Sequence, residues 1–230
     1  MTAPTDLNAA LDQMRAHTEP GRAEGSAAYH KVQRVYLGVP NPALNDLTRD
    51  WRQALTLDQR VNLARDLWDS DIHEARIAAG KLLTQARIRP DDAVWNLLQS
   101  WVPQFDAWAV ADHACSAIGR RLQADLTRLD VVEQWTRSDR MWTRRAALVS
   151  TLFLTKSNHP SADEAAARDR VLGWAAGYVP DTEWFIQKSI AWWLRDLSKH
   201  DTERARNFLN AHGPQMKAFA RKEAGKYLNG

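Results

Sequence analysis

Apolar residues recur every three to four positions along almost the entire chain, and this spacing limits the possible folds more than any other feature. Long runs of alternating apolar and polar residues and Asn-Gly hairpin signals are absent from the sequence. The pattern therefore predicts an all-α protein. We expect helices near residues 6–17, 24–35, 43–53, 58–68, 71–86, 91–99, 105–120, 121–127, 130–136, 140–155, 161–176, 182–198, 201–211 and 214–228.

Local signals mark the first helix ends. Asp6 is placed to cap the first helix, because a side-chain oxygen at that position can accept a hydrogen bond from a free backbone N–H group. The segment Glu19-Pro20-Gly21 is expected to end the helix. Residues 37–42 contain two prolines and are expected to form a rigid turn.

Three helical segments resemble one another and indicate internal repeats. They begin at Asp71, Asp139 and Thr182, so the offsets are 68 and 43 residues. Paired-helix repeats of the HEAT kind are about 40–47 residues long, and the first offset can contain one weaker copy. We expect a single domain over residues 1–230, folded as a curved right-handed α-solenoid with a concave groove. Chance similarity among amphipathic helices is the alternative explanation.

The composition is that of a soluble globular protein, with 44% hydrophobic and 26% charged residues. No stretch approaches the length of about 18 apolar residues that a transmembrane helix needs. The N-terminus also lacks the basic start and apolar run of a signal peptide. Cys115 is the only cysteine, which excludes an internal disulfide and fits a reducing cytosol. We therefore expect a cytoplasmic protein with no membrane partner.

Charge is distributed unevenly although the net charge is only +3. Residues 1–136 carry 15 Lys and Arg against 18 Asp and Glu, whereas residues 137–230 carry 16 against 10. A basic half can steer a nearly neutral protein toward a polyanion. A merely solvated surface explains so small an excess equally well.

Common catalytic signatures are missing. The sequence contains no Gly-rich nucleotide-binding loop, no zinc-binding His-Glu-x-x-His motif and no Gly-x-Ser-x-Gly nucleophile motif. The seven His residues are scattered and Cys115 has no Cys partner, so we expect neither a metal site nor a cofactor.

Trp108 and Asp112 form the most distinctive pair in the sequence. On a helix, four-residue spacing places a ring and a carboxylate on the same face, one turn apart. Asp112 is the only acid in a small and apolar stretch from Ala107 to Gly119, where a carboxylate is costly unless it is exposed, paired or used. The alternatives are core packing for Trp108 and an ion pair with an Arg of the next repeat for Asp112.

Cationic and aromatic residues are also combined in the C-terminal half. Arg144 and Arg145 are adjacent, so one can face the core and one the concave surface. Their planar guanidinium groups suit phosphate, although inter-repeat ion pairs are the alternative. Lys188 and Arg195 flank Trp192 and Trp193 on one helix, and we expect one of these two Trp residues to lie in the core.

These residues carry a resemblance to a known family. The chain resembles the AlkD-type DNA alkylation repair family of HEAT-like alkylpurine DNA glycosylases, over about residues 20–226. The matching stretches are Tyr29–Pro42, Leu67-Trp68-Asp69, Glu74–Ala79, Trp108-x-x-x-Asp112, Ser138–Ala147, Glu183–Arg195 and Arg221-x-Glu223-Ala. The resemblance implies release of N3- or N7-alkylated purines from double-stranded DNA by hydrolysis of the N-glycosidic bond, in the bacterial cytosol or nucleoid. We expect a monofunctional enzyme that acts as a monomer.

The resemblance also implies roles for individual residues. Trp108 and Asp112 would line the excision site, and Arg145 would hold the DNA backbone there, with Trp192 as a further wall. We expect Tyr29, Arg144, Lys188 and Arg195 to take part in DNA binding. Family members can carry a second Trp and an acid where this chain has Ala107 and Ala109, which implies a wider or differently supported rim.

The implied mechanism requires no deep pocket. An alkylated purine is already cationic and leaves without a general acid, while positive charge grows on the deoxyribose. Trp rings attract this charge and Asp112 stabilises it or orients the attacking water. Two alternatives remain, namely a non-catalytic HEAT-like protein that binds DNA structures and a HEAT-type protein scaffold.

Overall fold

The computed structural model of the protein describes residues 3–228 and is all-α, as the periodicity predicts. This part of the chain contains thirteen α-helices and four short 3-10 helices, and its one β-bridge joins Val35 to Ile72. None of the helices in residues 3–228 is long and apolar enough to cross a membrane. The helices group into two compact units, one ending at Arg121 and one beginning at Leu122. That the chain is a single domain with a curved, right-handed course remains a prediction.

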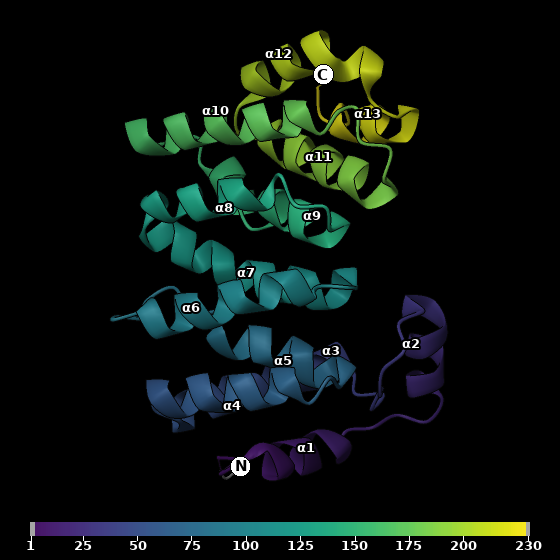
Figure 1. The fold of residues 1–230 in the computed structure, drawn as a ribbon, viewed down its shortest axis with the longest axis vertical. Coiled ribbons are helices and arrows are strands. Elements are labelled where there is room, and N and C mark those ends of the chain that lie inside the picture. The colour runs from purple at the N-terminus through teal and green to yellow at the C-terminus, as the bar shows by residue number, and fades with distance from the viewer. Residues whose placement is uncertain (1–2, 229–230) are drawn as a thin grey trace. The chain divides into compact units, whose positions relative to one another are not determined.

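The first unit is built from six helices and most of a seventh (Figure 1). They are α1 (Leu7–Arg15), α2 (Arg22–His30), α3 (Asn41–Ala54), α4 (Leu57–Asp69), α5 (His73–Leu83), α6 (Asp92–Trp101), the 3-10 helix η1 (Val102–Gln104) and α7 (Trp108–Ala124).

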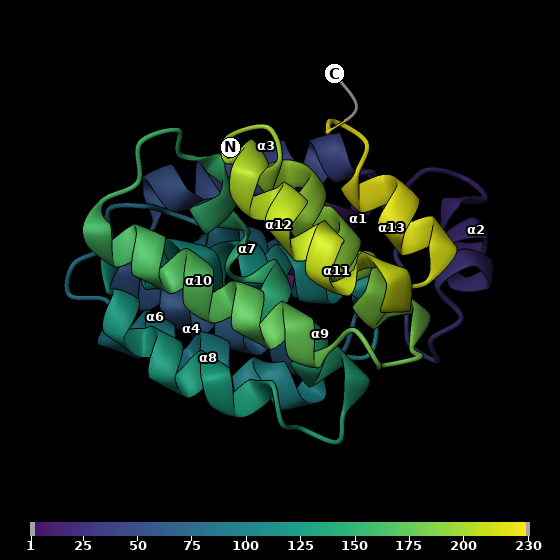
Figure 2. The same ribbon diagram turned by 90° about the horizontal axis from the view of Figure 1, so that it is seen from above.

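The second unit continues with η2 (Leu126–Arg128), α8 (Leu129–Trp135), α9 (Met141–Val149), η3 (Leu152–Lys156), α10 (Ala162–Gly177), α11 (Trp184–Leu197), α12 (Thr202–His212), η4 (Gly213–Gln215) and α13 (Ala218–Ala224). Within this unit α11 is central and contacts α9, α12 and α13. Figure 2 shows α11 and α12 lying next to each other, with α13 beside them.

Most helix positions are confirmed, and several predicted boundaries are wrong, among them that of the helix expected over 24–35, which ends at His30. Asp6 caps α1, since its side chain accepts a hydrogen bond from the Ala9 backbone N–H (2.9 Å). The helices expected over 105–120 and 121–127 are one helix, α7, and the helix expected over 140–155 ends at Val149 and is followed by η3. Pro42 lies in the first turn of α3, where a missing N–H costs nothing, so the rigid turn ends earlier than expected.

Tryptophan forms much of the core in the first unit. Trp68 and Trp101 are fully buried and stack with ring centroids 4.3 Å apart and planes 3° from parallel. The Trp68 indole N–H donates to Gln104 Oε1 (2.9 Å), and that of the buried Trp51 donates to Gln13 Oε1 (2.8 Å). Because the indole N–H groups of Trp68 and Trp51 keep hydrogen-bond partners, these two rings are buried without stranding a polar group.

Gly80 marks the closest approach of α5 to α7. A Cβ atom at this position would lie 2.9 Å from the backbone carbon of His113 and 3.0 Å from the Ala114 nitrogen. Real Cβ atoms do not come so close to backbone atoms, so only glycine permits this spacing. The neighbouring residues Ala78 and Ala79 are also buried.

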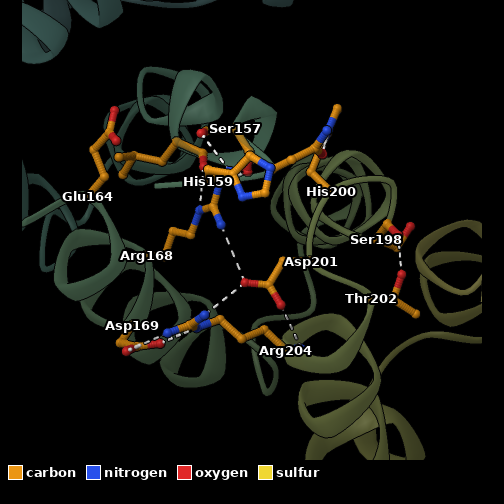
Figure 3. A network of polar contacts seen from close by, with 12 residues as sticks. Ser157, His159, Glu164, Arg168, Asp169, Ser198, His200, Asp201, Thr202 and Arg204 are labelled. Atoms are coloured by element: carbon orange, nitrogen blue, oxygen red, sulfur yellow. Dashed lines mark hydrogen bonds and ion pairs between the residues drawn. The ribbon is translucent and has the colours of Figure 1, made fainter. Parts of the chain in front are cut away.

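A buried arginine joins three segments of the second unit (Figure 3). The Arg168 side chain on α10 is 1% exposed, and its Nε donates to the Leu154 carbonyl oxygen at 2.6 Å. The same guanidinium group donates to the Ser157 carbonyl oxygen (2.5 Å) and to Asp201 Oδ2 (3.3 Å). Asp201 in turn caps α12 by accepting from the Arg204 backbone N–H. Arg168 therefore ties η3 and the loop after it to the start of α12.

The first unit contains a similar arrangement. Arg121 is fully buried and donates to the carbonyl oxygens of Gln85, Ala86 and Ile88, and it forms an ion pair with Asp91 (2.9 Å). Asp91 directly precedes α6, as Asp201 directly precedes α12. In both units an arginine thus satisfies loop carbonyls and an acid at a helix start, a role that helical periodicity does not reveal.

Candidate functional site

Trp108 and Asp112 lie on the exposed face of α7, one turn apart. Trp108 is the first residue of the helix and is 38% exposed, which makes it one of the few large apolar side chains that reach solvent. Asp112 is half-buried, and the Ser116 hydroxyl one turn later donates to the Asp112 carbonyl oxygen (2.9 Å). Core packing is therefore not the explanation for Trp108.

Ala107 and Ala109, on either side of Trp108, are both buried. The expectation of a wider or differently supported rim at these two positions stays a prediction. Their small side chains point into the protein and allow the start of α7 to pack closely.

Tyr29 joins Trp108 from α2. The two ring centroids are 6.2 Å apart with planes at 88°, an edge-to-face pair, and Tyr29 is 69% exposed. His30 also contacts the indole, with ring centroids 5.4 Å apart. The structure thus places Tyr29 against Trp108, and the register of α7 places Asp112 one turn from the indole. That these residues form the excision site stays a prediction.

Glu74 anchors the loop that follows α2. This buried carboxylate on α5 accepts hydrogen bonds from the backbone N–H groups of Leu37 (2.9 Å) and Gly38 (2.8 Å). Gly38 has φ = +75°, and a Cβ there would lie 2.9 Å from the Ala23 nitrogen on α2. The loop conformation therefore needs glycine at this position.

Arg34 provides a second anchor for the same loop. Its side chain is almost fully buried and forms ion pairs with Asp106, just before α7, and with Asp71 (3.3 Å), just before α5. Asp71 also pairs with Arg76 at 3.1 Å. The start of α7 and the chain after α2 are therefore fixed to the same cationic group.

A layer of neutral rings lies beneath Trp108. The His30 ring contacts those of His73 (4.5 Å) and Tyr36 (6.3 Å), and the Tyr36 and His73 centroids are 4.7 Å apart. Burial, followed by repulsion from His30 and Arg34, lowers the pKa of His73 to about 3. Burial also lowers the pKa of His30. Both imidazoles are therefore uncharged at neutral pH.

This layer predicts sensitivity to acid. A neutral His73 in the folded state, with a pKa of about 3 against 6.5 when unfolded, stabilises the fold above pH 6.5 and loses this contribution as pH falls toward 3. We expect the free energy of unfolding to be about 2 kcal/mol lower at pH 5 than at pH 7.5. Urea denaturation at both pH values measures the difference. His73→Phe retains a ring that cannot bind a proton, so an unchanged pH dependence in this variant would contradict the assignment.

In the second unit Arg145 lies among aromatic rings. Its guanidinium carbon is 5.6 Å from the Trp142 ring centroid and 6.0 Å from that of Phe185, within cation–π range. The Arg145 side chain is mostly buried on α9. The rings of Trp142 and Phe185 also contact each other, at 4.6 Å between centroids.

Lys188 and Arg195 converge on one carboxylate. Both side chains on α11 form ion pairs with Glu223 on α13. Arg195 also pairs with Asp196 (3.2 Å), which accepts a hydrogen bond from the Trp192 indole N–H (3.1 Å). Trp192 is half-buried while Trp193 is fully buried, so Trp193 is the core member of the pair, as one of the two was expected to be.

Arg144 is held by internal contacts. It pairs with Asp181 at 2.9 Å and donates to the carbonyl oxygens of Ser138 (2.8 Å) and Asp139 (3.0 Å). Tyr178 donates its hydroxyl hydrogen to the Arg144 carbonyl oxygen. This matches the ion-pair alternative for the Arg144-Arg145 pair, and Arg144 is better suited to positioning α9 than to reaching a ligand.

The sequence analysis missed an exposed aromatic group in the second unit. Trp184 is half exposed, stacks on Phe219 of α13 (5.6 Å, 18°) and meets Phe185 edge-on (4.9 Å). The Lys188 ammonium group lies 6.0 Å from the Trp184 ring centroid. These rings come from two helices, so only the apolar positions within the Glu183–Arg195 stretch hinted at them.

No group of three or more His, Cys, Asp or Glu residues in the described part of the chain is arranged to hold a metal ion.

These features define a helical-repeat protein that presents aromatic, acidic and cationic groups at its surface. A family model described as DNA alkylation repair enzyme matches residues 10–228, and the chain belongs to this family. The AlkD-type resemblance seen in the sequence is thus confirmed. No curated protein matches the chain by sequence.

Solved structures show the same fold. A protein described as a predicted DNA alkylation repair enzyme from Enterococcus faecalis is 23% identical, with a TM-score of 0.75 over 93% of this chain and 97% of the other. AlkD2 from Streptococcus mutans is 18% identical, with a TM-score of 0.61 over 83% and 91%. The smu.31 protein from Streptococcus mutans UA159 is also 18% identical, with a TM-score of 0.60 over 82% and 92%.

Proposed function

We propose that the protein is a monofunctional DNA glycosylase that releases cationic N3- or N7-alkylated purines from double-stranded DNA. One observation carries the proposal most directly: an exposed indole, Trp108, is buttressed edge-on by Tyr29 and lies one helical turn from the carboxylate of Asp112. A role in DNA alkylation repair follows from family membership, and the hydrolytic chemistry is the proposed refinement.

The reaction needs stabilisation of a cation rather than a strong acid. Alkylation at N3 or N7 makes the purine a neutral leaving group, so the C1′–N bond breaks as positive charge develops on the deoxyribose. The electron-rich faces of Trp108 and Tyr29 attract that charge. The Asp112 carboxylate stabilises it and orients the water that adds at C1′.

Most enzymes that act on bases rotate the base into a pocket. We propose instead that the lesion stays stacked and that the enzyme acts from the sugar–phosphate side. The shallow, exposed position of Trp108 and Tyr29 supports this route, because both rings lie at the surface.

In the second unit, cationic groups would hold the DNA backbone. Lys188 and Arg195 would donate charge-assisted hydrogen bonds to phosphate oxygens, and such contacts fix register without reading sequence. The expected contact of Arg145 requires its guanidinium group, which is buried here, to become accessible. Trp192 would form a further aromatic wall. Its indole N–H donates to the Asp196 carboxylate, which also pairs with Arg195. Arg144 would act indirectly, by holding α9. We further propose that the protein works as a monomer in the cytoplasm.

The decisive test is incubation with methylated duplex DNA followed by chromatography of the freed bases. We expect release of 7-methylguanine or 3-methyladenine without strand cleavage. Binding that falls with salt but yields no free base would favour the non-catalytic DNA-binding alternative. Absence of any duplex affinity would favour a protein scaffold.

A further inference from the structure

The first unit contains a cavity of about 450 Å³ between α3, the end of α5 and α7. Its walls include Asn45 and Arg52 of α3, Lys81 of α5, Thr84, and His113 and Ser116 of α7. Ser116 is the residue one turn beyond Asp112, so the cavity opens beside the helix face that carries Trp108 and Asp112. Along the axis of α7, Ser116 lies about 6 Å from Asp112. This distance is about the rise of two base pairs in duplex DNA.

Two cations in this cavity have no acidic partner within the described residues. Arg52 Nη1 donates to the Lys81 carbonyl oxygen (2.7 Å), and the Lys81 ammonium group donates to Asn45 Oδ1 (2.6 Å). Both acceptors are neutral. In residues 3–228, the one carboxylate that lines the cavity, Asp46, is engaged by Arg49, which also lines it, at 2.7 Å.

The electrostatics agree with this geometry. Burial, followed by repulsion from Arg52, lowers the pKa of Lys81. Burial, followed by repulsion from Arg60 and Arg49, lowers the pKa of Arg52. Burial together with Lys81 also lowers the pKa of His113 to about 4, so this side chain is neutral and does not add charge. The cavity therefore holds two positive charges that repel each other, an arrangement that an anion would stabilise.

We propose that this cavity binds a phosphate group of the DNA backbone close to the damaged nucleotide. The proposal rests on the proposed function, because it assumes that duplex DNA lies along the exposed face of α7. Lys81 and the remaining amino group of Arg52 donate to the phosphate oxygens. Contact at this point fixes the position of the strand relative to Asp112 and Trp108.

The test compares duplex binding by wild type, Lys81→Gln and the double variant Arg52→Gln/Lys81→Gln, measured by fluorescence anisotropy between about 50 and 300 mM salt. Loss of this one phosphate contact is expected to reduce the slope of log K against log salt by about 0.9 in the double variant, and by part of that amount in Lys81→Gln. Lys81→Arg keeps a cation and should restore most of the slope. Arg65→Gln, which removes an exposed charge from α4, is the matched control and should leave the slope unchanged.

The remaining outcomes separate a failure of the phosphate site from a failure of the glycosylase chemistry. An unchanged slope in a double variant with normal circular dichroism would overturn it. Titration with inorganic phosphate separates the sources: binding of free phosphate that depends on Lys81, with no change in the DNA salt slope, would assign the cavity to a free anion instead. Wild type that binds duplex DNA but releases no base refutes the glycosylase chemistry and leaves the phosphate site standing. Wild type without duplex affinity refutes both.

Discussion

Replacing Asp112 by asparagine is expected to slow release of alkylated purines by at least about 100-fold, the size of effect seen when a group that stabilises transition-state charge is removed. The amide has nearly the same shape as the carboxylate but carries no negative charge. Positive charge on the sugar would then meet only the rings of Trp108 and Tyr29. DNA binding should change little, because the loss falls on the transition state.

Single-turnover measurement of 7-methylguanine release, together with anisotropy, separates these effects. Asp58→Asn is a suitable control, since it makes the same change at an exposed carboxylate in the first turn of α4. Full activity in Asp112→Asn would refute the assigned role. An equal loss in both variants would point to a general effect of charge rather than to the site.

Replacing Arg168 by alanine is expected to lower the free energy of unfolding by about 3–5 kcal/mol, as removal of one partner from a buried ion pair does. The substitution leaves the carbonyl oxygens of Leu154 and Ser157 without their donor and removes one partner of Asp201. Urea denaturation followed by circular dichroism measures the change.

Arg204 supplies the matched control for Arg168. It belongs to the same network and pairs with Asp169 and Asp201 (both 2.8 Å), but its side chain is 35% exposed (Figure 3). Surface ion pairs contribute little, so Arg204→Ala should cost less than about 1 kcal/mol. Similar losses in the two variants would show that burial of Arg168 is not what makes its network important.

The fold class could be predicted because helical periodicity is local and persists along the chain. The boundary errors arose where tertiary contacts override local signals. The break predicted between residues 120 and 121 is absent and α7 continues, because the Arg121 side chain is buried against the loop before α6. Likewise, no sequence pattern shows that an arginine will satisfy loop carbonyls some thirty residues away.

The site was predictable in part for a similar reason. Four-residue spacing within one helix places Trp108 and Asp112 on a common face, and the structure keeps them there. The choice between Trp192 and Trp193, and the internal pairing of Arg144 with Asp181, depend on which helices pack together. The cationic cavity was missed because Arg52 and Lys81 are distant in sequence and carry no motif.

Gly80 has a consequence for the helix that bears Trp108 and Asp112. Because α5 rests directly on the main chain of α7 at His113 and Ala114, the register of the two helices is set by bare backbone contact rather than by adaptable side chains. Even a single methyl group at position 80 would force the backbone of one helix to shift, because its carbon would lie 2.9 Å from the His113 backbone carbon. The positions of the Trp108 indole and the Asp112 carboxylate therefore depend on the missing side chain of Gly80, which packs against the residues that follow Asp112.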